Sequence, residues 1–376
     1  MRARIVIIGT GTTALCLALE FARRTNPLRE PVLLISGGTP ELAALELCSH
    51  DLEGSGHALE ARHGLRFWSG LWAATGRDPG WNACGLVYES GKETNDSVWK
   101  RLRELGASVR KEGDRVLDED AGTLSTENAV RALEALAREA GAVVRRGELA
   151  EEIMVENGKV VGVKTSKGEI SSTEIILAGA EAATLAPGAA LVLEREERTE
   201  LCFERTPGEE VDAETARRET PMRDLFSSEE LGMSGSASAF ENHFEVEEPD
   251  RSEARAKVCA DETALPEQGG QLWLMAKEKR KAELLAAVQE TSNNEQGRLE
   301  RRHCLWRSPD KSPVIGPALS TQGLWVACAF GENAALFAPA CAEGLATRIL
   351  DGESGWFSGQ EYDPSRAALN WQSRSR

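Results

Sequence analysis

The chain has 376 residues, of which 41% are hydrophobic and 28% charged, a balance typical of a globular protein with a substantial core. Its formal net charge of −17 argues against nucleic acid as a partner, because the phosphates would be repelled. Eight cysteines without C-x-x-C spacing and five scattered histidines predict no disulfide framework and no metal site. They favour reduced thiols in the cytoplasm. No uninterrupted apolar segment is long enough to span a bilayer.

The N-terminal stretch predicts a strand, a tight glycine turn and a helix. Ile5–Ile8 run into the pattern Gly9-x-Gly11-x-x-Ala14, and apolar residues at helical spacing follow. In such a turn the first glycine bends the chain, the second leaves room for phosphates, and the small third residue lets helix and strand pack. The amides that begin the helix then point at the anion. The alternative is a glycine turn that binds no ligand. The predicted diphosphate-binding residues are Gly9, Gly11, Thr12, Thr13 and Ala14.

The same stretch is similar to a secretory signal, because Met1-Arg2-Ala3-Arg4 precedes an apolar run. Glycines and threonines interrupt that run, however, and it passes into Glu20 without a small-residue cleavage site. We therefore expect it to belong to the mature fold.

Strand and helix patterns alternate through the next part of the chain, as in an α/β protein. A second strand over 31–36 ends at Ser36, where dinucleotide folds usually carry an acid that binds the ribose. Residues 39–80 look helical. The further expected elements are a strand at 84–88, an amphipathic helix around 98–105, a helix capped by Ser125 or Thr126, a strand at 142–145, a hairpin at 152–165 turning at Asn157-Gly158, and a strand at 174–180.

The second half of the chain is harder to interpret. Charge runs such as Glu194 to Glu200 predict solvated loops and edges of a second domain within residues 194–270. The expected elements after it are a strand at 272–275, a helix at 277–289, a strand at 324–327 and a helix from about 338 to 350.

The order of these segments resembles the glycine oxidase and D-amino-acid oxidase superfamily of FAD-dependent amine oxidoreductases. The resemblance rests on the Gly-x-Gly turn, on EIILAGA at 174–180, on SPDKSPVIGP at 308–317, and on GLWVACAFGENAALFAPACAEGLATRIL at 323–350. It implies an α/β fold with a Rossmann-like FAD-binding domain built from discontinuous segments, and an antiparallel-sheet (α+β) substrate domain. We assign 1–80, 121–190 and 300–376 to the first domain and 81–120 and 191–299 to the second.

The resemblance also implies FAD as cofactor and a small amine or amino-acid-like substrate, whose C–N bond is oxidised by hydride transfer to the flavin. By position, Ser36 would face the ribose and Ala150 the adenine, while Gly179 and Ala180 would pass near the diphosphate. The residues that would lie near the flavin ring are Arg307, Gly316, Gly331, Glu332, Asn333 and Ala334.

Several positions depart from the family pattern. Ser36 replaces an acid, and no convincing Ser/Gly-rich stretch follows the second strand. Glu332 puts a carboxylate where backbone amides normally meet the electron-rich edge of the ring, and an anion there disfavours reduced flavin. Leu305 stands where many amino-acid oxidases place the arginine that binds the substrate carboxylate, so Arg302 or Arg307 is the candidate substitute.

Some relatives attach FAD covalently through a cysteine in the same segment. Cys304 is the candidate for such a bond, although its spacing is one residue short of that pattern. A buried, unreactive thiol is the preferred interpretation.

Three functions are consistent with these residues. The first is an FAD-dependent oxidase or dehydrogenase acting on an amine or amino acid. The second is an accessory flavoprotein or subunit that acts on or with a partner protein, and the third is a binding protein on the same fold that has lost catalysis. An NAD-linked dehydrogenase fits less well, because the chain returns to the first domain at its C-terminal end. The sequence leaves oligomerisation open.

Overall fold

A computed structural model defines the fold of this chain. The structure describes residues 2–38, 45–50, 57–88, 92–113, 115–186, 191, 193–204, 222–226, 244–247, 255–258, 271–277, 298–318, 321–353, 355–357 and 359–366. Within these ranges, the side chains of some residues, among them Arg302, Cys304 and Glu332, lie outside the described part.

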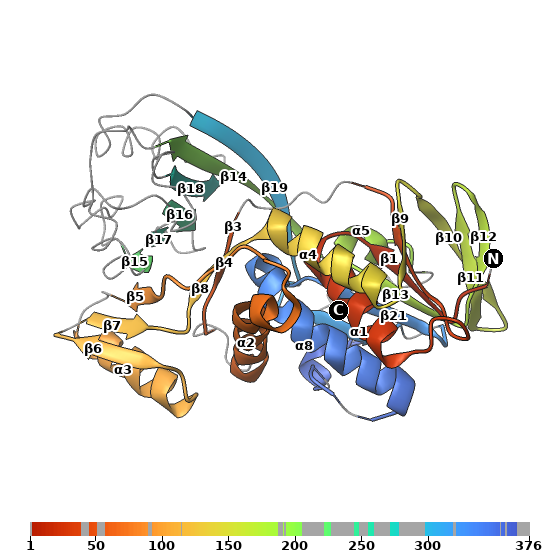
Figure 1. The fold of residues 1–376 in the computed structure, drawn as a ribbon, viewed down its shortest axis with the longest axis horizontal. Coiled ribbons are helices and arrows are strands. Elements are labelled where there is room, and N and C mark those ends of the chain that lie inside the picture. The colour runs from red at the N-terminus through yellow and green to blue at the C-terminus, as the bar shows by residue number, and fades with distance from the viewer. Residues whose placement is uncertain are drawn as a thin grey trace, which may run out of the picture.

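A six-stranded sheet forms the centre of the fold, in the order β20-β21-β13-β1-β2-β9 (Figure 1). Five strands are parallel, and β20 runs antiparallel to β21 at one edge. This arrangement confirms the α/β class predicted from the sequence. The strands are β1 (Ile5–Gly9), β2 (Val32–Ser36), β9 (Val143–Arg146), β13 (Glu174–Ala178), β20 (Val314–Pro317) and β21 (Leu324–Cys328).

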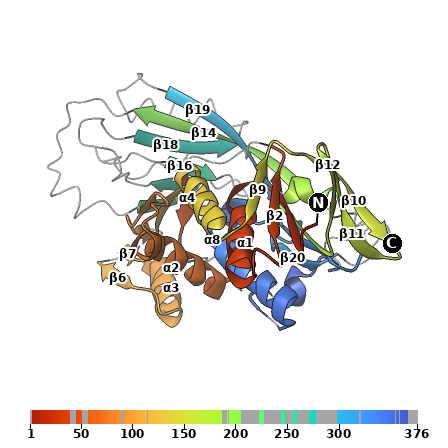
Figure 2. The ribbon, with the colours of Figure 1, turned by 45° about the vertical axis from the view of Figure 1, so that its right-hand side comes forward.

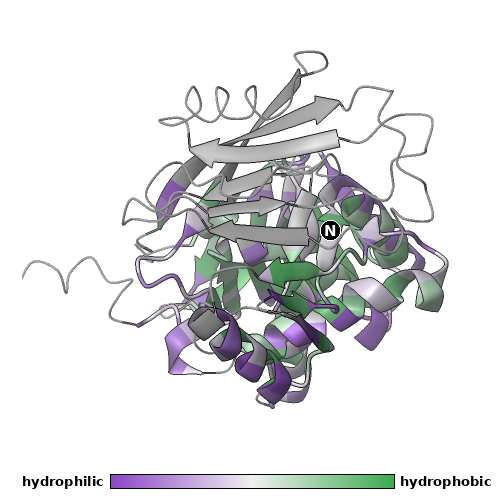
Figure 3. Cartoon of the chain, turned by 90° about the vertical axis from the view of Figure 1, so that its left-hand side faces the viewer, coloured by the Kyte–Doolittle hydropathy of each residue, from purple (hydrophilic) through white to green (hydrophobic). Residues whose placement is uncertain are grey.

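The two faces of this sheet pack against different layers, because successive strand residues point to opposite sides. Ile5 and Ile7 share a core with three helices, α1 (Gly11–Arg24), α4 (Thr126–Glu139) and α8 (Ala334–Ala346). Val6 and Ile8 pack instead against a three-stranded sheet on the other face (Figure 2). Hydrophobic colouring is concentrated in the strands at the centre, and hydrophilic colouring on the outer helices (Figure 3). The small sheet consists of β10 (Ala150–Glu156), β11 (Lys159–Thr165) and β12 (Gly168–Ser171).

The local signals for caps and turns are confirmed. The Ser125 hydroxyl accepts a 3.4 Å hydrogen bond from the Asn128 amide at the start of α4. Asn157 and Gly158 both have positive φ, 51° and 75°, as the predicted hairpin turn between β10 and β11 requires. Among the described helices, none is both long and apolar enough to cross a membrane.

The prediction of a continuous helical region over 39–80 is wrong in part. Residues 58–75 form helix α2 (Ala58–Thr75), but β3 (Leu45–Cys48) is a strand that pairs antiparallel with β8 (Gly122–Ser125). Strand β4 (Trp81–Asn82) pairs with the other edge of β8. Pairing with residues far along the chain has overridden a local helical pattern. Residues 39–44 and 51–56 lie outside the described ranges.

A second, larger sheet has nine strands in the order β19-β14-β18-β16-β17-β15-β5-β7-β6, and most neighbours are antiparallel. Two pairs, β15 with β5 and β16 with β18, are parallel. Helix α3 (Lys92–Glu104) packs against β6 and β7. The strands are β5 (Leu86–Tyr88), β6 (Val109–Glu112), β7 (Arg115–Asp118), β14 (Glu194–Glu204), β15 (Met222–Phe226), β16 (Phe244–Glu247), β17 (Arg255–Val258), β18 (Gln271–Lys277) and β19 (Arg298–Arg307).

This sheet corrects the interpretation of the charged run Glu194 to Glu200 as a solvated loop or edge. The run belongs to β14, which is paired on both sides, with β18 and with β19. Backbone hydrogen bonds define a strand whatever its side chains are, so charge alone does not exclude one. The helix predicted at 277–289 falls almost wholly outside the described ranges. The domain boundaries stay a prediction.

Helices α2 and α8 approach each other closely at Gly64. A methyl group built there would lie 1.8 Å from the carbonyl oxygen of Leu336, so only glycine permits this contact. Nearby, the Trp68 indole donates a 2.9 Å hydrogen bond to the carbonyl of Ala335. Helix α8 begins at Ala334, about one turn earlier than the sequence predicts. The chain continues through a π-helical turn η3 (Thr347–Asp351) and a 3₁₀ turn η4 (Gln360–Tyr362).

Gly64→Ala should lower the free energy of unfolding by about 1–3 kcal/mol, because the added methyl forces α2 away from α8. Gly70→Ala, in the same helix, is the matched control. A methyl there meets nothing within 4 Å, so the substitution should stabilise by about 0.5–1 kcal/mol. Urea unfolding of both variants measures the difference, and equal midpoints would contradict the packing described.

Candidate functional site

The carboxyl edge of the parallel sheet begins at Gly9, the last residue of β1. A methyl group built on Gly9 would lie 2.0 Å from the carbonyl oxygen of Ala178 on β13, and the φ of Gly9 is 153°. Only glycine allows the two strands to approach in this way. In open α/β sheets ligands bind outside this edge, so the glycine turn lies where a ligand is expected.

Helix α1 starts immediately beyond that edge and has no side-chain cap. The side chain of Thr10 makes no capping hydrogen bond, and no acidic residue lies in the first turn. Gly11 has a φ of 76°, and Thr12 and Thr13 are 4% and 7% exposed. The first amides of a helix have no partner within it, so a buried, uncapped start is suited to an anion. Ala14 is completely buried where α1 packs on the sheet.

The end of β13 completes one side of this edge. Gly179 has a φ of 98°, and a methyl group built there meets no atom within 4 Å. Its amide donates a 2.8 Å hydrogen bond to the carbonyl of Ala327 on β21, and Ala180 begins the short helix α5 (Ala180–Ala183). Open space beside the uncapped α1 amides fits a dinucleotide diphosphate.

Ser36 and Ala150, predicted at the adenosine end, are brought to one place. The Ser36 carbonyl accepts a 2.8 Å hydrogen bond from Gly147, three residues before β10 begins at Ala150. A methyl group on Gly37 would lie 2.5 Å from Cδ2 of Leu149 and 3.2 Å from the carbonyl oxygen of Glu148, so Gly37 packs closely against this segment. The loop between β9 and β10 therefore covers the end of β2.

Glu148, the acidic residue next to this loop in the sequence, forms hydrogen bonds with other residues of the fold. Glu148 is 1% exposed, and it accepts hydrogen bonds from Thr165 Oγ1 at 2.6 Å and from Arg145 at 3.3 Å. Arg146 donates to Glu134 at 2.8 Å. Ser36, at the predicted ribose position, therefore offers a neutral hydroxyl and no nearby free carboxylate from these residues.

Five of the six residues predicted near the flavin ring, all except Gly316, lie in or beside a 3₁₀ turn, η2 (Gly331–Asn333). Arg307, at the end of β19, forms an isolated antiparallel bridge with Phe330. A methyl group on Gly331 would lie 3.2 Å from Arg307 Nε, so the arginine side chain lies along this turn. Asn333 precedes α8 without a side-chain capping bond, and Ala334 begins that helix. The side chain of Glu332 lies outside the described part.

Gly316 lies farther from this turn. A methyl group built there would be 3.0 Å from Cδ of Pro364 and 3.9 Å from the Arg348 guanidinium, so this glycine faces the C-terminal segment. Its positive φ of 153° and this close packing both require glycine.

Strand register distinguishes Arg302 from Arg307. Strand β19 pairs with β14 without interruption from Arg298 to Arg307, and strand positions alternate between two faces. Positions 305 and 307 therefore share one face, whereas position 302 belongs to the opposite face. Arg307 stands about 6.8 Å along the strand from Leu305, the position at which the family resemblance predicts a carboxylate-binding arginine.

The turn after β19 is held by Asp310. Ser308 Oγ donates to Asp310 at 2.7 Å, and Arg366 donates at 2.6 and 2.8 Å. Burial opposes ionisation, but these hydrogen bonds prevail and lower the pKa of Asp310 to about 2. The carboxylate therefore stays charged and fixes the direction in which the chain leaves Arg307.

Cys328, at the end of β21, lies three residues before η2 and is unsuited to act as a nucleophile. It is fully buried, and burial raises the pKa of its thiol to about 12. The thiol therefore stays protonated at neutral pH. Cys304, the candidate for covalent attachment, has its side chain outside the described part.

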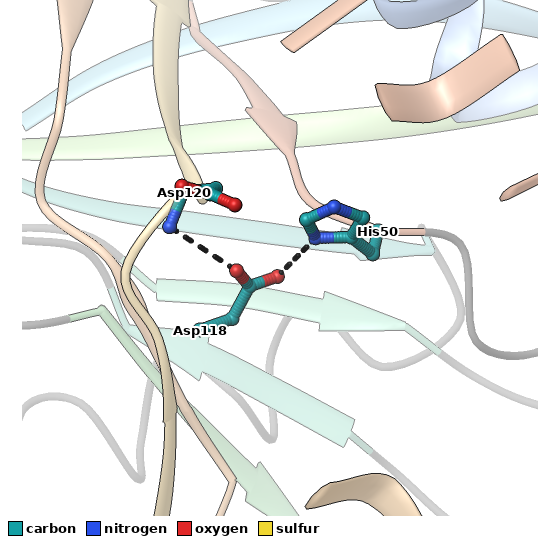
Figure 4. Close-up of side chains that lie close together, drawn as sticks. All are labelled: His50, Asp118 and Asp120. Atoms are coloured by element: carbon teal, nitrogen blue, oxygen red, sulfur yellow. Dashed lines mark hydrogen bonds and ion pairs between the residues drawn. The ribbon is translucent and has the colours of Figure 1, made fainter. Parts of the chain in front are cut away.

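The structure also reveals buried polar residues to which the sequence assigned no role. His57 Nδ1 and the Tyr362 hydroxyl share a 2.6 Å hydrogen bond between the start of α2 and the C-terminal segment. His50 and Asp118 form a second buried pair (Figure 4). These pairs join residues 305 and 68 positions apart, and no local spacing signals them.

Comparisons with known proteins agree with this geometry. The family model described as "FAD dependent oxidoreductase" matches residues 4–348. L-Proline dehydrogenase from P. horikoshii superposes with a TM-score of 0.68 at 16% identity, covering 96% of this chain and 97% of that one. Glycine oxidase from Geobacillus kaustophilus gives 0.68 at 17%, covering 97% and 99%, and L-amino acid deaminase from Proteus myxofaciens gives 0.69 at 14%, covering 96% and 93%. A search of curated protein sequences found no significant match.

Gly11→Val should abolish retention of the dinucleotide, because the valine side chain would occupy the space of the diphosphate and would strain a backbone of positive φ. Ligand absorbance after gel filtration measures retention, and circular dichroism confirms that the variant is folded. A folded variant that keeps the wild-type amount of ligand would remove the diphosphate from this turn.

Proposed function

The chain belongs to the FAD-dependent oxidoreductase family, and on that basis we propose that it oxidises a C–N bond of an amine or amino-acid-like substrate. The observation that carries the proposal is the buried, uncapped start of α1 between Gly9 and Gly179, at the carboxyl edge of the sheet. When bound, FAD supplies the hydride acceptor. The protein's own task is to hold the substrate and to exclude water from it.

The proposed FAD site extends along that edge. The α1 amides and the glycine turn would hold the diphosphate, with Gly179 and Ala180 beside it. Ser36 and the backbone of Ala150 would hold the adenosine, and η2 with Arg307 would border the flavin ring. Gly316 would support the ring side indirectly, since it packs closely against Pro364 in the C-terminal segment.

Arg307 is the proposed substrate-binding residue. It shares a face of β19 with Leu305, and its side chain lies along η2. A guanidinium presents a fork of N–H donors that matches a carboxylate, and it stays charged at any working pH. An amino acid bound there by its carboxylate would have its α-carbon directed toward the ring side of the site.

Arg307→Gln should lower kcat/KM for amino-acid substrates by roughly 30-fold or more, since removing one partner of a charged hydrogen-bonded pair costs about 2 kcal/mol or more. Steady-state kinetics measure the loss. Arg77→Gln, which removes a surface arginine paired with Glu139, is the control. A larger loss in Arg302→Gln than in Arg307→Gln would overturn the choice between the two arginines.

A visible spectrum before and after acid precipitation tests the cofactor. A flavin band released into the supernatant means non-covalent FAD, and anaerobic bleaching by amines or amino acids would then support the proposed reaction. A band that stays in the pellet means covalent attachment and makes Cys304 the candidate attachment residue. A colourless protein that cannot be reconstituted with FAD would contradict the proposal.

Glu332→Gly should make the flavin reduction potential more positive. Glu332 lies in η2, and removing a negative charge beside the ring favours the anionic reduced form. Potentiometric titration of the two proteins measures the shift. An unchanged potential would exclude Glu332 from the surroundings of the ring.

Ser36, Glu332 and the single glycine of η2 favour a second candidate, an accessory flavoprotein or a catalytically degenerate binding protein on the same fold. Such a protein would act on or with a partner protein. It would keep FAD, but free amines would not bleach the absorbance of its flavin. We propose the cytoplasm as its location in either case, since scattered thiols persist in a reducing compartment.

A further inference from the structure

The last described segment of the chain packs against the central sheet with alternate residues buried. Tyr362 and Pro364 are buried, and the side chain of Arg366 is 9% exposed. The Tyr362 hydroxyl and His57, at the start of α2, share a 2.6 Å hydrogen bond, and Pro364 lies against Gly316 of β20. The segment is therefore anchored at two places before it reaches Arg366.

Arg366 has an acceptor for each of its N–H donors. Nε donates to Asp310 Oδ2 at 2.6 Å, and Nη2 donates to Asp310 Oδ1 at 2.8 Å and to the carbonyl of Ser312 at 2.7 Å. Nη1 donates to the carbonyls of Pro313 at 3.1 Å and Asp363 at 3.5 Å. A guanidinium has five such donors in one plane, and four of these bonds go to the turn between β19 and β20.

This turn begins directly after Arg307. Ser308 is the next residue, is 1% exposed, and donates its hydroxyl to Asp310 at 2.7 Å. The Ser308 carbonyl accepts a 3.0 Å hydrogen bond from the amide of Lys311, whose φ is 60°. A residue other than glycine keeps such a φ only where its surroundings hold it. Arg366 thus supports a tight turn that starts one residue beyond Arg307.

The same turn connects the two largest sheets. Strand β19 belongs to the nine-stranded sheet and β20 to the six-stranded sheet, so the turn helps to place the end of β19 against the central sheet. Arg366 also lies within electrostatic range of Cys328 at the end of β21. Burial raises the pKa of the Cys328 thiol to about 12, and the charge of Arg366 opposes that rise. The guanidinium is therefore close both to the turn after Arg307 and to the strand that leads into η2.

We propose that Arg366 is a positioning residue for the substrate carboxylate. This inference rests on the proposed function, in which Arg307 binds that carboxylate. Arg366 holds the turn between β19 and β20, and the turn holds Arg307 at η2, where its side chain lies beside Gly331. A guanidinium meets both oxygens of a carboxylate only when it is correctly directed. A small movement of the turn therefore weakens binding although no group that touches the substrate is lost.

The test measures the dissociation constant of radiolabelled acetate, a simple carboxylate, by equilibrium dialysis against the FAD-loaded protein. Arg366→Gln should weaken acetate binding roughly 3–20-fold, within the range for residues that act on a site without touching its ligand. For an amino-acid substrate KM should rise by a similar factor with kcat almost unchanged, since only binding is affected.

Arg366→Lys is the second variant, and it decides the test if Arg366→Gln does not fold. Lysine keeps the positive charge beside Asp310 but lacks the planar fork that reaches Ser312 and Pro313. Acetate should therefore bind this variant more weakly than wild type as well. Wild-type affinity in Arg366→Lys would show that charge alone suffices and would contradict positioning by the fork.

A double variant separates positioning from general destabilisation. If Arg366 acts through Arg307, the variant carrying both Arg307→Gln and Arg366→Gln should bind acetate as weakly as Arg307→Gln alone. Two losses that multiply would contradict the inference. Arg24→Gln is the matched control, because Arg24 also joins distant segments, through a 3.0 Å hydrogen bond to Thr347 Oγ1 and an ion pair with Asp351. It should keep wild-type affinity, and a comparable loss there would contradict a specific role of Arg366.

The outcomes distinguish this inference from the proposed function. If both Arg366 variants bind acetate as tightly as wild type while Arg307→Gln does not, the positioning role is overturned and the role of Arg307 stands. If Arg307→Gln binds as tightly as wild type, or wild type binds no acetate, the role of Arg307 fails and the inference fails with it. Equal flavin absorbance in all the proteins confirms that the FAD site is not what has changed.

Discussion

The close approach of β1 and β13 at Gly9 is the constraint on which the arrangement of the site depends. A methyl group built on Gly9 would lie only 2.0 Å from the carbonyl oxygen of Ala178. The two strands can therefore come this close only because Gly9 has no side chain. The next residues begin α1, so its unpaired amides lie beside the end of β13. Both the strand pairing and the position of these amides therefore depend on a single missing Cβ.

Segments far apart in the sequence supply the rest of the site. The central sheet takes β20 and β21 from the C-terminal third of the chain, and α8 packs its small residues against α1 and α2. Gly64 permits one of these contacts, as Gly9 permits the strand contact. The turn η2 then connects β21 to α8 and lies against both β3 and β19. Arg307 reaches the site through this last contact.

Several carboxylates of this acidic protein are paired with nearby side chains of the fold. Glu148, Glu134 and Asp310 each accept hydrogen bonds from arginines or hydroxyls, so these carboxylates are compensated within the fold. Asp118 is different, because its described partners are a histidine and a backbone amide. Asp118 is thus a buried carboxylate at the junction between two sheets that no described lysine or arginine compensates.

The sequence by itself determined the elements whose signals are local. The strand–glycine–helix start, the Ser125 cap and the Asn157-Gly158 hairpin were all predictable, because turn chemistry and hydrophobic periodicity act over a few residues. Tertiary structure alone decided the rest. Strand β3 forms only because β8 is present to pair with it, and β14 forms despite its charges because β18 and β19 flank it. The register of β19 places Arg307 and Arg302 on opposite faces of the strand, and it is set by pairing with β14. The contact of His50 with Asp118 likewise joins residues far apart in the sequence. Residue spacing along the chain predicts neither arrangement.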